Sequence, residues 1–149
     1  MTTPTSPAGR LVESDEDIGQ LIARTQRIAV LGIKTADSMQ PAYYVADYTK
    51  RAGFEIIPVP VYFPDVTEIL GERVYRTLAS IPGPVDMVNV FRRPKDLAAH
   101  FDDIVAKRPK SVWLQLGIAD DAFADRLTRE GIDVVQDKCL MVELQRHGR

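Results

Sequence analysis

Cysteine and histidine are nearly absent from this chain of 149 residues, which holds one cysteine and two histidines. A single cysteine cannot form an intramolecular disulfide, and so few sulfur and imidazole donors argue against a cysteine- or histidine-rich metal site. No apolar run approaches the roughly 20 residues that span a bilayer, and the N-terminus has no apolar signal core. These absences predict a cytoplasmic protein with no membrane partner.

A strong excess of either charge is also missing, since the formal net charge is −2. A surface this close to neutral disfavours duplex nucleic acid as a partner. The length argues for a single domain, which we expect over residues 13–149, after a flexible tail over residues 1–12 that is rich in Thr, Pro, Ser and Gly. The sequence leaves open whether this domain forms a homo-oligomer.

Short apolar runs alternate with helical patterns along the rest of the chain. The apolar runs predict five strands, over residues 27–33, 54–61, 85–91, 111–116 and 132–135. Helical spacing of apolar residues, with capping residues and prolines at the expected starts, predicts helices that begin near Asp15, Pro41, Pro94, Asp121 and Asp137. The stretch between the second and third strands is less regular and suggests isolated helical turns.

This alternation predicts an α/β fold, namely a Rossmann-like open parallel sheet of five strands with helices on both faces, in three layers. We expect the strand order 3-2-1-4-5, with right-handed crossovers. Ligands of such sheets bind at the carboxyl ends of the strands, near the point where the strand order reverses. The loops that meet there begin at Gly32, Pro60, Phe91 and Gly117.

The loop after the first strand begins at Gly32 and leads to the helix that Pro41 opens. Glycine lets the backbone turn close to a ligand, and a helix N-terminus favours an anion. We therefore interpret the amides from Ile33 to Ser38 as a phosphate cradle, with Lys34 as an added positive charge. A simple turn glycine and a solvated lysine are the alternatives, because the GxGxxG fingerprint of dinucleotide sites is absent.

The end of the second strand bears on which nucleotide is bound. Sites for NAD carry Asp or Glu there to bond the ribose hydroxyls, whereas this chain has Val59, Pro60, Val61 and Tyr62. No arginine is present for the 2′-phosphate of NADP either. These residues disfavour nicotinamide dinucleotides, and Tyr62 is interpreted as stacking on a base or packing under its loop.

Two arginines, Arg92 and Arg93, follow the third strand directly before a helix, which is a good setting for an anion. We favour ligand contact for Arg92, with Phe91 against an adenine or in the core. The alternative is a surface pair that bridges to acidic residues elsewhere. Gln115 ends the fourth strand, where a buried amide needs a partner from the backbone or from a ligand.

No group of residues has the arrangement of a catalytic site, so no catalytic and no metal-binding residue is assigned. Cys139 has neither histidine close to it in the sequence and is interpreted as a small buried side chain. His100 is interpreted as a solvent-facing side chain of its helix.

Several motifs, in the same order along the chain, resemble a known family. They are IAVLGIK, PAYYVADYTKRAGFEIIPV, EILGERVYRTLASIP, VDMVNVFRRP, SVWLQLGI and VVQDKCLMVE, which lie within residues 27–146. They are similar to the small stand-alone CoA-binding proteins related to the CoA-binding domain of the succinyl-CoA synthetase α-subunit. The resemblance implies a Rossmann-like domain that holds coenzyme A or an acyl-CoA at the carboxyl ends of the strands.

The resemblance also implies roles for individual loop residues. Carried over by position, these are Gly32, Ile33, Lys34 and Thr35 for the pyrophosphate, Ser38 and Pro41 for the start of the helix, Pro60 and Tyr62 for the ADP part, Phe91 and Arg92 for the adenine or a phosphate, and Gln115 and Gly117 for the pantetheine arm.

Two places depart from the family's pattern. Met39 and Gln40 stand where members often carry an arginine, and residues 59–62 stand where they often carry Asn-Pro and a basic residue. The synthetase α-subunit also has a second domain with a phosphorylated histidine, which a chain of this length cannot hold. The resemblance therefore implies binding without ligase chemistry. The alternatives are a nucleotide-binding enzyme or partner subunit, either CoA-ligase-like or an oxidoreductase, and a scaffold that has lost its ligand.

Overall fold

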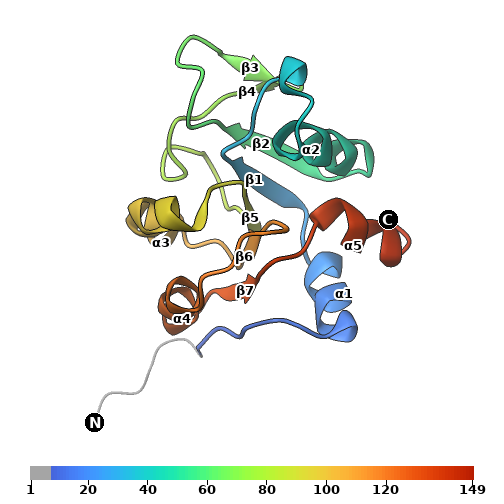
Figure 1. The fold of residues 1–149 in the computed structure, drawn as a ribbon, viewed down its shortest axis with the longest axis vertical. Coiled ribbons are helices and arrows are strands. Elements are labelled where there is room, and N and C mark those ends of the chain that lie inside the picture. Colours follow the sequence, from blue (N-terminus) through green and yellow to red (C-terminus); the bar gives the residue numbers. More distant parts are fainter. Residues whose placement is uncertain (1–7) are drawn as a thin grey trace.

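The computed structural model describes residues 8–149, and its centre is a five-stranded parallel sheet (Figure 1). The strands are β1 (Arg27–Leu31), β2 (Glu55–Val59), β5 (Met87–Val90), β6 (Ser111–Leu114) and β7 (Asp133–Val135). Every pairing in this sheet is parallel, so the carboxyl ends of the strands lie along one edge. The predicted α/β Rossmann-like class is confirmed.

The order of the strands corrects our expectation. We expected 3-2-1-4-5, but the third strand in chain order, β5, lies between β1 and β6, so the order is 2-1-3-4-5. Pro58 explains why β2 takes the edge of the sheet, because proline lacks the N–H that a further neighbour would need. On that outer edge the Pro58 carbonyl accepts a hydrogen bond from Tyr75 N at 3.0 Å, while the Val59 carbonyl faces β1 and accepts one from Gly32 N.

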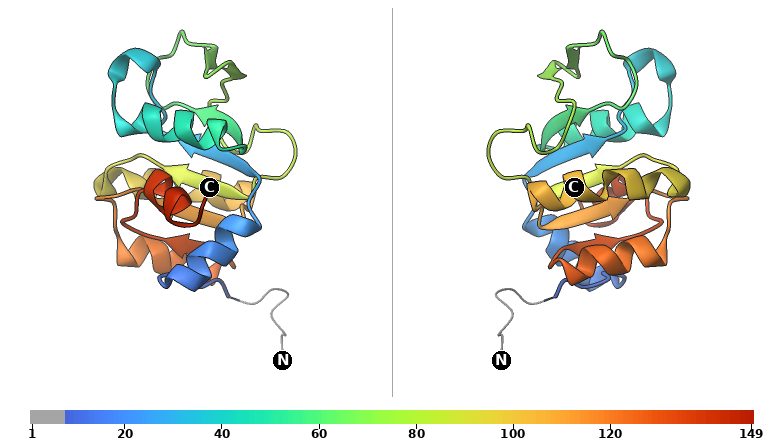
Figure 2. Two further views of the ribbon diagram at one scale, coloured as in Figure 1. Left: turned by 90° about the vertical axis from the view of Figure 1, so that its right-hand side faces the viewer. Right: turned by 90° about the vertical axis from the view of Figure 1, so that its left-hand side faces the viewer.

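Helices cover both faces of the sheet, which gives the predicted three layers. Figure 2 shows one face covered by α1 (Asp15–Ala23), α2 (Pro41–Arg51) and α5 (Leu140–Arg146). The other face carries α3 (Phe101–Lys107) and α4 (Asp121–Arg129), and the 3-10 helix η2 (Pro94–His100) leads directly into α3.

Buried side chains on both faces hold the layers together. Val88 and Leu114 belong to the cluster that packs against α3 and α4, whereas Val30 and Trp113 belong to the cluster beneath α1, α2 and α5. All four are at most 1% exposed. Because full burial of such a side chain contributes about 1.5–3 kcal/mol, strands that are buried on both faces form the most stable part of the sheet.

Two side-chain caps and one proline set helix starts where the sequence predicts them. The Ser14 hydroxyl accepts a hydrogen bond from Asp17 N, and the Asp120 carboxylate accepts one from Phe123 N, at the starts of α1 and α4. Pro41 begins α2, where its missing N–H needs no partner. These interactions involve residues within one helical turn, which is why the sequence reveals them.

Residues 60–86 connect β2 to β5 without the helical turns that we expected. Instead, β3 (Glu68–Ile69) and β4 (Glu72–Arg73) form a small antiparallel hairpin beyond β2 (Figure 1). Leu70 and Gly71 have φ of 57° and 73° at its turn. Two successive residues in this left-handed region interrupt a right-handed helix, so a hairpin forms here.

The N-terminal segment adds to the edge of the sheet. Residues 1–7 of the expected tail lie outside the described residues, but residues 9–12 run beside β7. Leu11 forms a parallel bridge with Val134, and Val12 N donates to the Val134 carbonyl at 2.8 Å. Val12 is 2% exposed. The fold therefore includes these residues, because the open edge of β7 satisfies their backbone groups and buries an apolar side chain.

His147 joins the C-terminal end of α5 to the start of α1. Its ring lies against Gly19, where an added Cβ would come within 2.9 Å of it. Its Nδ1 lies 2.8 Å from the Glu143 carbonyl oxygen and its Nε2 lies 3.0 Å from the Asp15 carbonyl oxygen. Only the protonated ring can donate to both, and these two hydrogen bonds raise the pKa of His147 above its ordinary value.

We predict that replacing His147 by Gln lowers the free energy of unfolding more in mildly acidic than in alkaline solution. Because the folded-state pKa is raised, the stabilisation is complete below the unfolded-state value of about 6.5 and is lost as the pH rises through the folded-state value. Urea denaturation of both proteins between about pH 5 and about pH 9 measures the difference. A difference that stays constant with pH would contradict this role.

Candidate functional site

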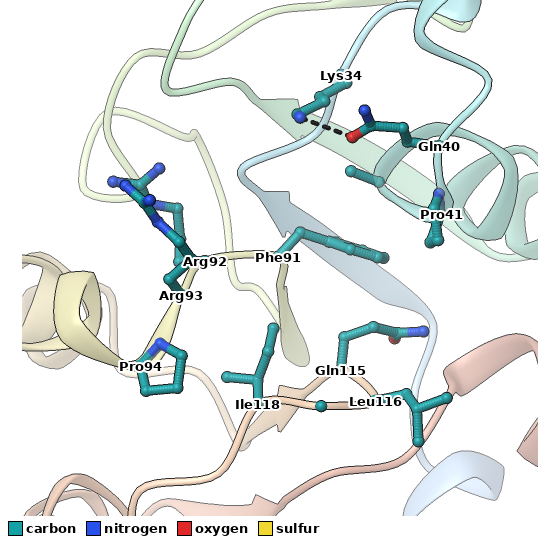
Figure 3. Close-up of a pocket in the computed structure, with 12 residues that line it drawn as sticks. Lys34, Gln40, Pro41, Phe91, Arg92, Arg93, Pro94, Gln115, Leu116 and Ile118 are labelled. Atoms are coloured by element: carbon teal, nitrogen blue, oxygen red, sulfur yellow. Dashed lines mark hydrogen bonds between the residues drawn. The ribbon is translucent and has the colours of Figure 1, made fainter.

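A groove opens at the carboxyl ends of β1, β5 and β6 (Figure 3). It lies at the topological switch point of the sheet, because β2 pairs with one side of β1 and β5 with the other. It has two lobes, and four residues line both of them, namely Lys34, Phe91, Arg92 and Arg93. The apolar lobe, of about 310 Å³, is lined by Lys34, Gln40, Pro41, Ala42, Phe91, Arg92, Arg93, Pro94, Gln115, Leu116, Gly117 and Ile118. The cationic lobe, of about 330 Å³, is lined by Gly32, Lys34, Tyr62, Phe91, Arg92 and Arg93.

Gly32 allows the ends of β1 and β5 to approach each other. Its φ is +87°, and an added Cβ would lie 2.4 Å from the Phe91 carbonyl oxygen and 3.2 Å from Arg92 Cδ. A larger residue would therefore meet backbone as well as adopt an unfavourable conformation. The space that this glycine leaves is filled by the neighbouring strand, which sets the relative position of the two loops.

Lys34 is the residue of the first loop that enters both lobes. Its Nζ donates to Gln40 Oε1 at 2.7 Å, as Figure 3 shows, and its backbone N donates to the Ala42 carbonyl at 3.1 Å. A neutral amide thus orients the ammonium group without cancelling its charge. The side chain stands between the end of β1 and the start of α2.

Arg92 is held by three side chains. Its Nε donates to His100 Nε2 at 3.2 Å, its Nη1 lies 3.5 Å from the Tyr62 hydroxyl, and its Nη2 lies 3.7 Å from Asp96 Oδ2. The side chain is only 14% exposed. Asp96 also pairs with the exposed Arg93, at 3.2 Å. Hydrogen bonding to Arg92 and the positive charge of Arg92 lower the pKa of Tyr62.

The charged residues that line the groove are all cations. These are Lys34, Arg92 and Arg93, and no acidic residue lines either lobe within the described part of the chain. Asp96 forms ion pairs with both arginines but is not a lining residue. The groove therefore attracts anions, and phosphate groups match the planar donors of arginine.

The opposite side of the groove is apolar. Phe91, Leu116 and Ile118 come from the ends of β5 and β6, and Pro41 and Pro94 begin the helices that flank them (Figure 3). Leu116 is 66% exposed, which is unusual for a large aliphatic side chain. This surface suits an uncharged, partly apolar part of a ligand.

Gln115 lies at the base of the apolar lobe with its side chain fixed. It is 4% exposed, and its Oε1 accepts hydrogen bonds from Asn89 Nδ2 and from Leu140 N, each at 3.3 Å. Because the Leu140 amide can only donate, the oxygen must face it. The Nε2 of Gln115 makes no hydrogen bond with any of residues 8–149, so it remains a donor for a ligand in the groove.

The described part of the chain has neither a cluster of metal ligands nor a helix that could span a membrane. Among residues 8–149, no three or more His, Cys, Asp or Glu side chains gather as metal ligands would. Over the same range, no helix combines the length and the apolar character needed to cross a membrane.

A model of a protein family, described as a CoA binding domain, matches residues 26–145 of this chain. The chain belongs to the CoA-binding domain family. This CoA-binding domain protein is 32% identical over 129 residues to the Bacillus subtilis protein YneT, a match that covers 87% of this chain and 93% of YneT.

Solved structures of similar chains have the same architecture. A Thermus thermophilus protein of 37% identity superposes with a TM-score of 0.82 and covers 91% of this chain and 99% of its own. A Pyrococcus horikoshii protein of 26% identity superposes with a TM-score of 0.83 and covers 100% of both chains. These small relatives share the fold of this chain along nearly their whole length.

The structure brings most of the predicted site residues of this CoA-binding domain together at the groove. The residues that line the groove include Gly32 and seven other predicted positions, namely Lys34, Pro41, Tyr62, Phe91, Arg92, Gln115 and Gly117. Gly117 has φ +85° and donates its N–H to Asp137 Oδ1 at 2.7 Å, which shapes the loop after β6.

Four predicted positions lie outside the lining. Ile33 is 1% exposed in the core beneath α2, and Pro60 is also buried. The Thr35 hydroxyl bonds the Asp37 carboxylate, and the Ser38 hydroxyl accepts from Gln40 N at 3.3 Å. These polar side chains thus organise the turn between β1 and α2.

Other lining residues were not assigned from the sequence. They are Gln40, Ala42, Arg93, Pro94, Leu116 and Ile118. All of them except Pro94 directly adjoin an assigned residue, so a search extended by one position around Pro41, Arg92 and Gly117 would have found the other five. His100 was interpreted as solvent-facing, but it is half-buried and contacts Arg92.

We predict that Gly32→Ala destabilises the protein more than Gly117→Ala. Both positions have a positive φ, which costs a non-glycine residue about 1–3 kcal/mol. Only the Cβ at position 32 meets the Phe91 carbonyl, whereas an added Cβ at position 117 meets nothing within 4 Å. Urea denaturation of the two variants and the wild type measures the difference. Equal losses would show that the close approach at Gly32 contributes nothing to stability.

Proposed function

We propose that this CoA-binding domain protein binds coenzyme A or an acyl-CoA in the groove. The observation that carries the proposal is the division of the groove into a cationic lobe and an apolar lobe with a shared wall. Coenzyme A has the matching chemistry, because a nucleotide with several phosphate charges is joined to a long uncharged arm. The proposal concerns binding alone, without ligase chemistry.

The phosphates occupy the region between β1 and β5. Lys34, Arg92 and Arg93 supply positive charge there. The N–H of Ala42, in the first turn of the 11-residue helix α2, donates to no acceptor among residues 8–149, and the positive end of the helix dipole adds to the attraction for an anion. The Phe91 ring, which both lobes share, lies against the adenine.

The pantetheine arm follows the end of β6. Its amide carbonyls accept a hydrogen bond from Gln115 Nε2, the donor that has no protein acceptor among the described residues. Leu116 and Ile118 contact the methyl and methylene groups of the arm. Burial of those groups explains why a large aliphatic side chain stands exposed in the ligand-free protein.

Nicotinamide dinucleotides fit the groove less well. The chain after β2 reads Val59, Pro60, Val61 and Tyr62, which gives neither a carboxylate for the ribose hydroxyls of NAD nor an arginine for the 2′-phosphate of NADP. These two compounds are therefore the appropriate competitors in a binding experiment.

Calorimetric titration with coenzyme A, acetyl-CoA, NAD and NADP tests the proposal. We expect heat of binding with coenzyme A or acetyl-CoA and none with the dinucleotides. Tight binding should also raise the melting temperature, because a ligand that binds only the native state stabilises it. Absence of both heat and thermal shift with either CoA species would overturn the proposal, and preferential binding of NAD would favour an oxidoreductase-type site.

We predict that Arg92→Ala weakens binding of coenzyme A about tenfold or more at low salt, which is the usual contribution of a hydrogen bond to a charged group. The loss should shrink as salt is added, because the contact is ionic. Arg129→Ala is the matched control, since that residue is exposed on α4, pairs with Asp125 and changes the net charge equally. Equal affinities of wild type and Arg92→Ala at low salt would remove Arg92 from the site.

A further inference from the structure

The hydrogen bond between Arg92 and His100 determines which ring nitrogen of the histidine carries the proton. The guanidinium Nε can only donate, and it lies 3.2 Å from His100 Nε2. That ring nitrogen must therefore carry a lone pair, which places the proton of the neutral imidazole on Nδ1. His100 is the last residue of η2, eight residues after Arg92.

We propose that His100 is the positioning residue of the groove, an uncharged acceptor that orients the Arg92 guanidinium toward a ligand phosphate while leaving its positive charge available. This inference rests on the proposed function, because it assigns a role in the same ligand site. His100 itself acts through Arg92 and is not a lining residue of either lobe.

The other contacts of Arg92 are consistent with His100 orienting the guanidinium while the guanidinium itself binds the phosphate. The guanidinium has five N–H donors in one plane, and His100 takes the one at Nε. The Tyr62 hydroxyl lies near Nη1 and Asp96 lies 3.7 Å from Nη2, which makes no hydrogen bond with any of residues 8–149 and can therefore donate to a phosphate oxygen. A carboxylate in place of His100 would hold the same geometry but would compete with the phosphate for the charge.

The surroundings of His100 favour the neutral ring. Burial is the largest cause that lowers the pKa of His100, and the positive charge of Arg92 lowers it further. Two carboxylates act in the opposite direction, Asp103 on α3 and Asp96 on η2. The net direction is downward, so the ring is an acceptor near neutral pH and loses its lone pair only in acidic solution.

The role of His100 makes the contribution of Arg92 depend on pH. When the ring is protonated, its Nε2 becomes a donor, so it can no longer accept from Arg92 and places a second positive charge beside it. The guanidinium then loses its orientation. The affinity that Arg92 contributes should therefore fall in acidic solution, and the fall should disappear when an acceptor that does not titrate replaces the ring.

Calorimetry with coenzyme A on five proteins tests the proposal: wild type, His100→Ala, His100→Gln, Arg92→Ala and the double variant His100→Gln/Arg92→Ala. At about pH 7.5 we expect His100→Ala to weaken binding about fivefold, the usual effect of one lost hydrogen bond, and His100→Gln to bind as the wild type does, because its Oε1 still accepts from Arg92. Thermal denaturation of each variant confirms that it is folded.

The pH dependence separates positioning from a structural role. As the pH falls from about 7.5 into the range where the His100 ring takes up a proton, the factor lost on Arg92→Ala should shrink in the wild-type background and stay constant in the His100→Gln background. Changes in the charge of coenzyme A affect both backgrounds equally. If the factor shrinks equally in both, or if His100→Ala binds as tightly as the wild type, this inference is overturned while the proposed function stands.

A measurement on the free protein completes the test. Nitrogen-15 chemical shifts of the His100 ring, assigned with the help of His147→Gln, report which nitrogen carries the proton. We expect the Nδ1–H tautomer at about pH 7.5, and the Nε2–H tautomer would overturn the inference. Failure of the wild type to bind any CoA species, by contrast, would overturn the proposed function itself.

Discussion

The parallel pairing of β5 with β1 is the contact on which the groove depends. Its register sets Leu31 opposite Val90, so the two strands end together and their loops leave the sheet side by side. Phe91 N donates to the Leu31 carbonyl at 2.9 Å, and the Phe91 carbonyl fills the space where Gly32 lacks a Cβ. The loop after β5, which carries Arg92 and Arg93, and the loop after β1 are thereby brought within reach of one ligand. A bulkier residue at Gly32 would separate them.

The electrostatics of the groove follow from the kind of partner that each cation has. Lys34 is bonded to the neutral amide of Gln40, and Arg92 is bonded to the neutral ring of His100. Asp96 is the acidic partner of both arginines, and it is not among the residues that line the groove. The two neutral partners orient Lys34 and Arg92 without cancelling their charge, so a small protein of nearly neutral net charge presents a cationic groove.

The two departures from the family's usual pattern also have a physical meaning in this structure. Gln40 stands where members often carry an arginine, but its side chain positions Lys34 at the start of α2, so a cation remains near the helix N-terminus. Tyr62 lies where a basic residue is common, and its ring and hydroxyl contact Arg92, with the guanidinium 5.6 Å from the ring centroid. The loop that carries Tyr62 is fixed by Arg76, which donates to four backbone carbonyls in it.

The sequence by itself determined the α/β class, the family resemblance and the starts of α1, α2 and α4, because apolar periodicity, the caps at Ser14 and Asp120 and the proline at α2 act between residues within one or two turns of each other. The last helix begins at Leu140, three residues after the predicted Asp137, and Pro94 begins a 3-10 helix that precedes α3. Only the tertiary structure decided that β5 lies beside β1, that Gln115 Nε2 has no acceptor among residues 8–149 and that His100 bonds Arg92. Strand order depends on pairing between segments far apart in the chain, which local preferences do not specify. Which hydrogen bonds a polar side chain makes depends in turn on the neighbours that this pairing places around it.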